Sequence, residues 1–78
     1  MTAEAILDDI QQQIREARAR GRRRLRGCRL ADGPYAELWQ LEEKDFTSLT
    51  FRGTDGAHVE QLLVWRVGPG TTVRIVAT

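Results

Sequence analysis

The amino-acid sequence predicts an α+β fold in which an N-terminal amphipathic helix precedes a five-stranded antiparallel meander. Apolar residues recur at helical spacing near the N-terminus, and after Gly21 they alternate with polar residues between closely spaced turn signals. The 78 residues predict a single domain over residues 1–78. Its helix is expected at about residues 3–20 and its sheet, which can curl into a small barrel, at about 22–77.

The predicted helix begins after Thr2, whose side chain suits an N-cap, and Glu4 lies where the positive end of the helix dipole favours an acid. Its apolar residues fall within one stripe of a helical wheel: Ala3, Ile6, Leu7, Ile10, Ile14 and Ala17. Gly21 favours the end of the helix, and the arginines of its last turns suit its negative end.

Five strands are predicted after the helix. They cover Leu25 to Leu30, Tyr35 to Glu43, Phe46 to Arg52, His58 to Val67 and Thr71 to Ala77. The predicted turns are Ala31 to Pro34, Lys44-Asp45, Gly53 to Gly56 and Gly68 to Gly70. Residues 55–66 have a second interpretation, because Asp55 can cap a helix that ends at Gly68. The β-favouring residues 64–67 and the Gly-Pro-Gly turn that follows them favour a strand.

The fourth predicted strand is apolar on both faces. Leu62 and Val64 lie on the face opposite to Leu63, Trp65 and Val67. One face is expected to meet the helix or the far wall of a curled barrel, and the other is available to a partner subunit. A chain this short builds a small core, so we expect a homo-oligomer.

The charged residues are strongly polarised along the chain. Eight arginines and one acid, Glu16, lie between Arg15 and Arg29, a charge of +7, whereas the remaining residues hold four basic and ten acidic residues, a charge of −6. A concentrated positive field attracts polyanions. Arginine outnumbers lysine eleven to one. Either a GC-rich genome or the bidentate binding of phosphate by arginine explains that ratio, but codon bias does not explain the clustering.

We therefore predict a small nucleic-acid-binding domain for RNA or DNA, directed more at the phosphate backbone than at sequence. The predicted contact residues are Arg15, Arg18, Arg22, Arg23, Arg24, Arg26 and Arg29. Trp39 is the best candidate for an aromatic side chain outside the core that stacks on bases. The alternative is a protein-interaction module, such as a phage-type inhibitor or assembly factor, that docks on an acidic surface. A third interpretation is a structural subunit joined through its sheet edges.

The sequence does not predict an enzyme or a cofactor. Cys28 and His58 are the only residues of their types, so one chain provides neither a zinc site nor a convincing nucleophile and base. No phosphate-binding loop or dinucleotide fingerprint is present. The lone cysteine fits a reducing compartment, and neither an export signal nor a membrane span is indicated, so we expect a cytoplasmic protein.

Two segments resemble the bacterial Sm-like RNA chaperones. Leu30-Ala31-Asp32-Gly33 is similar to the first hairpin turn of that family, and residues 41–46 are similar to its acidic-aromatic junction between strands two and three. The family's bending glycine is replaced by Leu38 or Trp39, and its uridine-contacting Lys-His pair is missing after Gly56. The resemblance implies RNA binding by ring-shaped oligomers whose strands pair edge to edge.

Overall fold

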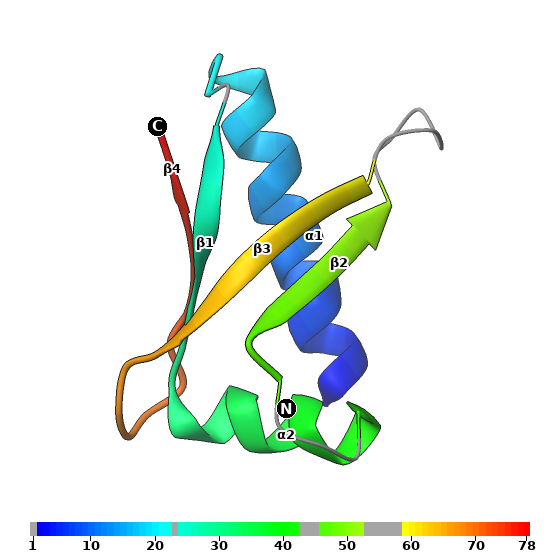
Figure 1. Cartoon of the computed structure of the whole chain (residues 1–78), viewed down its shortest axis with the longest axis vertical. Helices are drawn as coiled ribbons and strands as arrows, with labels where there is room; N and C mark the ends of the chain where they lie inside the picture. Colours follow the sequence, from blue (N-terminus) through cyan, green and yellow to red (C-terminus); the bar gives the residue numbers. More distant parts are fainter. Residues whose placement is uncertain (1, 23, 43–45, 53–58) are drawn as a thin grey trace.

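The computed structural model describes residues 2–22, 24–42, 46–52 and 59–78 (Figure 1). Over these residues the chain forms two α-helices and four β-strands. In chain order they are α1 (Ala3–Ala19), β1 (Leu25–Leu30), α2 (Asp32–Glu42), β2 (Ser48–Arg52), β3 (Val59–Arg66) and β4 (Val73–Ala77). The α+β class predicted from the sequence is therefore confirmed.

The four strands form one mixed sheet in the order β2-β3-β1-β4. β1 runs parallel to β3, whereas β1 with β4 and β2 with β3 pair antiparallel. α1 packs along one face of this sheet and α2 lies across one end of it (Figure 1). None of the described elements covers the opposite face of the sheet, which we call the uncovered face.

The predicted five-stranded antiparallel meander is wrong. Residues 35–43, which we predicted as a strand, belong mostly to α2, and the parallel pairing of β1 with β3 excludes a meander. Asp32 and Pro34 were interpreted as turn residues, but both also suit the first turn of a helix. The buried residues then follow helical spacing, since Ala31, Tyr35 and Leu38 all face the core.

Other elements agree with their predictions to within a few residues. α1 begins after Thr2, whose Oγ1 accepts a hydrogen bond from the Ala5 amide at 3.1 Å. Val59–Arg66 is a strand rather than a helix. The predicted turns at Lys44-Asp45 and at residues 53–56 lie outside the described residues.

The core lies between α1, α2 and the covered face of the sheet. Ile6, Ile10 and Ile14 of α1 are buried as their spacing predicts. They form one cluster with Cys28, Leu30, Tyr35, Leu38, Leu49, Phe51 and Leu62. At about 25 cal/mol per Å² of buried apolar surface, each fully buried aliphatic side chain contributes roughly 1.5–3 kcal/mol.

Aromatic and ionic contacts hold α2 across the end of the sheet. The rings of Tyr35 and Phe46 stack with 4.6 Å between their centroids and 16° between their planes. The Arg66 guanidinium, at the end of β3, lies 4.2 Å from the centre of the Tyr35 ring. Arg66 Nη2 also donates to Asp32 Oδ1 at 3.1 Å. Arg66 is thus engaged within the fold.

Candidate nucleic-acid interface

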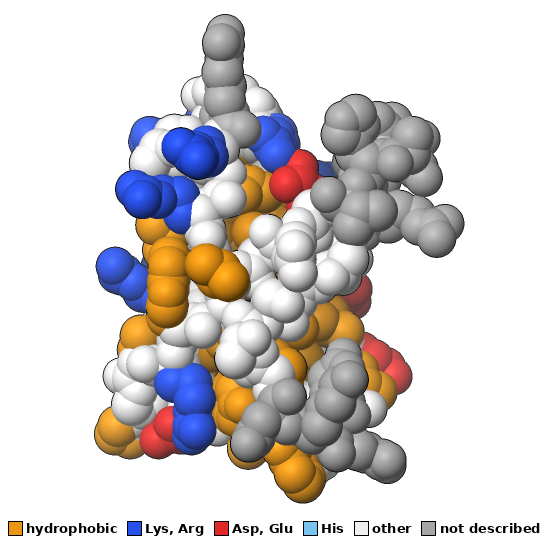
Figure 2. Space-filling model, viewed as in Figure 1, with side chains coloured by type: hydrophobic (Ala, Val, Ile, Leu, Met, Phe, Trp, Pro, Cys, Tyr) orange, Lys and Arg blue, Asp and Glu red, His pale blue; other side chains and the backbone are white. Residues whose placement is uncertain are grey.

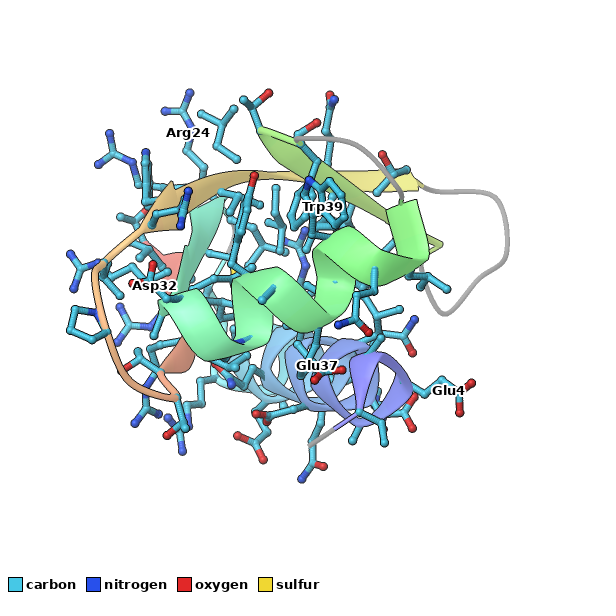
Figure 3. All side chains as sticks on the ribbon, turned by 90° about the horizontal axis from the view of Figure 1, so that it is seen from below. Glu4, Arg24, Asp32, Glu37 and Trp39 are labelled. Atoms are coloured by element: carbon cyan, nitrogen blue, oxygen red, sulfur yellow. The ribbon has the colours of Figure 1, made fainter. Side chains whose placement is uncertain are left out.

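A β-bulge directs the arginines of β1 to the uncovered face. The register with β4 shifts between Leu25 and Gly27, so two residues, Arg26 and Gly27, occupy the place of one. Leu25 and Cys28 consequently both pack toward the core although three positions separate them. The side chains that alternate with these core residues are exposed on the other face, namely Arg24, Arg26 and Arg29. Figure 3 shows Arg24 on the side of the sheet opposite α1.

Strand alternation alone places Arg24 and Arg26 on one face of the sheet and Arg29 on the other. The bulge removes that separation, because it changes the parity of the strand between Arg24 and Arg29. The uncovered face therefore receives every described arginine from this stretch.

Two rows of residues cross the uncovered face in register. In one row, Arg29 lies between Trp65 of β3 and Arg74 of β4. In the next, Gly27 lies between Leu63 and Val76. Neighbouring strands are about 4.8 Å apart, so the side chains of Trp65, Arg29 and Arg74 extend from backbone positions next to one another. Trp65 is 41% exposed and Leu63 is 54% exposed.

Gly27 makes room for the Trp65 indole. A Cβ added at Gly27 would lie 2.8 Å from Trp65 Cζ3 and 2.9 Å from Cη2, closer than side-chain carbons approach. The six-membered ring of the indole therefore rests against the backbone of β1. This contact holds the ring over Gly27 and leaves part of its surface open to solvent.

The uncovered face has basic, apolar and polar sections. Figure 2 views this face and shows arginine side chains gathered over the β1–β4 side, next to hydrophobic side chains. On the other side, Ser48, Thr50 and Gln61 supply neutral polar groups, and Gln61 Nε2 donates to Ser48 Oγ at 3.3 Å. None of the described residues that the strand registers assign to this face is acidic.

The remaining predicted arginines have different surroundings. Arg18 forms an ion pair with Glu60 of β3 and donates to the Arg22 carbonyl at 3.4 Å. Arg15 is exposed on α1. Arg22 lines a groove on the β4 side of α1, and Arg23 lies outside the described residues. The seven predicted residues therefore do not form one continuous ridge within the described part of the chain.

That groove separates the C-terminal half of α1 from β4 and has a volume of about 200 Å³. Its lining residues are Gln13, Glu16, Ala17, Arg20, Arg22, Arg74, Ile75 and Ala77. Gln13 also covers part of the outer edge of β4. Its Nε2 donates to the Val73 carbonyl at 2.9 Å, and its Oε1 accepts from the Ile75 amide at 2.9 Å.

Sequence reasoning assigned Gln13, Arg20 and Arg74 to no site, and it assigned Trp65 to an apolar face for a partner subunit and favoured Trp39 for stacking on bases. Gly27 gave a usable signal, because a glycine inside a strand often marks a bulge or a close approach of another group. Arg74 gave none, because only the pairing of β4 with β1 brings it to Arg29. Trp39, the aromatic we favoured, belongs to α2 and not to a strand; it is 43% exposed and lies on the side of α2 away from α1 (Figure 3).

Among the described residues, Cys28 has a shifted pKa. Burial raises the pKa of the Cys28 thiol to about 11, so this thiol is neutral at pH 7 and a poor nucleophile. No group of three His, Cys, Asp or Glu side chains in the described ranges is placed to hold a metal ion. No helix in the same ranges is long and apolar enough to cross a membrane.

Comparisons with protein-family models, curated proteins and solved structures find no match to this chain. Nothing in them bears on the resemblance to the Sm-like proteins.

Proposed function

We propose that this protein binds single-stranded RNA or DNA on the uncovered face of its sheet. The observation that supports the proposal best is the row formed by Trp65, Arg29 and Arg74, in which a partly exposed tryptophan and two arginines occupy paired positions on neighbouring strands. Trp65 stacks on a base, and Arg29 and Arg74, which both lie on the β4 side of Trp65, bind the phosphates that follow this base. The same combination of a basic surface and an aromatic ring serves many proteins that bind single strands.

A single strand fits this face better than a duplex. A base stacks on Trp65 only when its own flat surface is accessible, and in a duplex that surface is covered by neighbouring base pairs. The described residues of the face supply phosphate-binding groups and one ring, with few groups to distinguish base edges. We therefore expect binding that depends on the backbone and tolerates different sequences.

A second candidate function is docking on an acidic protein. Leu63 and Val67 are 54% and 45% exposed, and aliphatic surface of this kind adds nothing to the stacking of a base. Tryptophan and arginine are also enriched among the residues that dominate protein interfaces. In that case the arginines of the uncovered face pair with carboxylates of the partner.

Fluorescence anisotropy with a short labelled single strand, measured over a range of salt concentrations, tests the proposal. Affinity should fall with salt with a slope of roughly −0.7 per phosphate contacted. Arg29→Gln should reduce the magnitude of this slope by about 0.7, which corresponds to the loss of one phosphate contact. Arg15→Gln removes the same charge from α1 and should leave the slope nearly unchanged. If the wild-type protein binds no oligonucleotide at low salt, the nucleic-acid proposal is wrong and acidic-protein docking takes its place.

A further inference from the structure

The groove between α1 and β4 brings together arginines from three parts of the chain. Arg20 is the C-cap residue of α1, Arg22 follows in the connection to β1, and Arg74 comes from β4. Its volume of about 200 Å³ equals that of roughly six or seven water molecules in the liquid. That is enough space for one phosphate group and some of its hydration.

The negative end of α1 does not account for this cluster. It favours a basic residue such as Arg20 in the last turn, but its effect falls off within one turn and does not explain Arg74. Glu16 is the only acidic residue of the lining, and its basic residues are Arg20, Arg22 and Arg74, so the formal charges of the lining residues sum to +2. Glu16 Oε1 also accepts a hydrogen bond from Gln12 Nε2 at 3.3 Å.

The backbone of β4 favours a compact anion over a peptide strand in this groove. Val73, Ile75 and Ala77 direct their backbone groups away from β1, because Thr72 and Thr78 at either end bond toward it. Gln13 occupies the Val73 carbonyl and the Ile75 amide, so an added strand cannot pair along β4. Ala77 lines the groove, and its outward N–H is a further donor for an anion.

We infer that this groove binds the terminal phosphate of a nucleic-acid strand. A phosphate monoester has a charge of about −1.5 to −2 at pH 7, which matches the net +2 of the lining. Arg74 belongs to both sites, since it lines the groove and pairs in register with Arg29 on the uncovered face. A strand stacked on Trp65 can therefore continue over β4 and end in the groove. The assignment to nucleic acid rests on the proposed function, whereas phosphate binding in the groove does not.

An NMR titration of the ¹⁵N-labelled protein with inorganic phosphate tests the groove alone. We expect saturable shifts of the Ala77 amide and of the Arg20, Arg22 and Arg74 side-chain signals. Arg22→Gln should weaken the affinity severalfold, and Glu16→Gln should increase it severalfold. The matched controls are Arg15→Gln and Glu37→Gln, which change the net charge equally but away from the groove. Shifts spread evenly over all arginines, or equal effects of the controls, would overturn the inference.

Labelled strands with and without a terminal phosphate then test the link to nucleic acid. Terminal phosphorylation, at the 5′ or the 3′ end, should raise the affinity of the wild-type protein severalfold and have no effect on Arg20→Gln/Arg22→Gln. If phosphate binds the groove but no strand binds the protein, the groove inference holds and the proposed function fails. If strands bind through Trp65 and phosphorylation of either end changes nothing, the proposed function holds and the inference fails.

Discussion

The two faces of the sheet consist of alternate residues from the same strands, yet they have opposite properties. On the face covered by α1, Cys28, Leu30 and Leu62 are completely buried. On the uncovered face, Arg29 lies directly beside Arg74, and like charges in such positions destabilise a sheet. Packing against α1 explains why the residues of the covered face are apolar. The uncovered face retains the destabilising Arg29–Arg74 pair and the exposed Trp65 indole. This pattern is expected of a binding surface rather than of a surface selected for stability.

The largest difference between the two faces should be their tolerance of a charge. Ile10→Asp places a carboxylate against the covered face with no partner, which should cost roughly 3–5 kcal/mol and unfold the domain. Leu63→Asp adds the same charge on the uncovered face and should change stability by about 0.5–1 kcal/mol. Thermal unfolding followed by circular dichroism measures both. A folded Ile10→Asp protein contradicts the placement of α1.

Alkaline pH should destabilise the protein through Cys28 on the covered face. Its pKa rises from 9.0 to about 11 because burial disfavours the thiolate. The thiol of the unfolded chain therefore ionises at a lower pH than the thiol of the folded chain. The contribution of the buried, neutral thiol to folding stability is complete below pH 9 and is lost as the pH rises to about 11. Two pKa units correspond to about 2–3 kcal/mol. Urea unfolding at pH 8 and pH 11 should show this loss for the wild type but not for Cys28→Ala.

Gly27 precedes Cys28 in β1 but lies on the uncovered face, and it should be sensitive to substitution for a steric reason. An added Cβ would meet the Leu63 carbonyl oxygen and the Trp65 ring, both at 2.8 Å. Gly27→Ala should therefore cost about 1–3 kcal/mol and displace the indole, which shifts its fluorescence. Gly21→Ala is a useful control, because Gly21 has a φ of 81° and no atom near its Cβ position. That variant should destabilise the protein without changing Trp65 emission.

Substitution of Gln13, at the outer edge of β4, should have a smaller effect on stability. Gln13→Ala removes two hydrogen bonds to the backbone of β4, at a cost of roughly 1–2 kcal/mol. Gln12→Ala, which loses only an exposed bond to Glu16, should cost less than about 0.5 kcal/mol. Urea unfolding compares the two variants, and equal losses contradict the role of Gln13 at the β4 edge.

The predicted homo-oligomer stays a prediction, and the exposed side of β3 gives it a specific test. An oligomer formed through Leu63 and Trp65 should dissociate in Leu63→Asp, because the association would bury that charge. It should also dissociate when a single strand binds, since both partners need the same face. Light scattering measures both effects, and a monomeric wild-type mass at high concentration rejects the oligomer.

Local patterns predicted α1 well because its causes are local. Thr2 caps the helix and Ile6, Ile10 and Ile14 repeat at its period, so neither feature depends on distant parts of the chain. α2 was missed because Asp32 and Pro34 suit turns as well as helix starts. Its exposed Trp39 and Leu41 also weaken the helical pattern. The parallel pairing of β1 with β3 has no local signal.

The candidate site was predicted only in part for the same reason. The arginine cluster was visible in the sequence, and Arg24, Arg26 and Arg29 lie together on the uncovered face. Trp65 and Arg74 join them through strand pairing, and the bulge at Arg26 changes which side chains share a face. These relations depend on the register between strands, and a shift of one residue in register moves every side chain of a strand to the other face of the sheet.

The most direct test of single-strand binding on the uncovered face is the fluorescence of Trp65 in a Trp39→Phe protein, where Trp65 is the only tryptophan. Titration with an unlabelled single strand at low salt should quench the emission saturably, because a base stacks on the indole. Trp65→Phe retains Trp39 as its only tryptophan and should show no comparable quenching. Binding detected by anisotropy without any change in Trp65 emission would contradict the account.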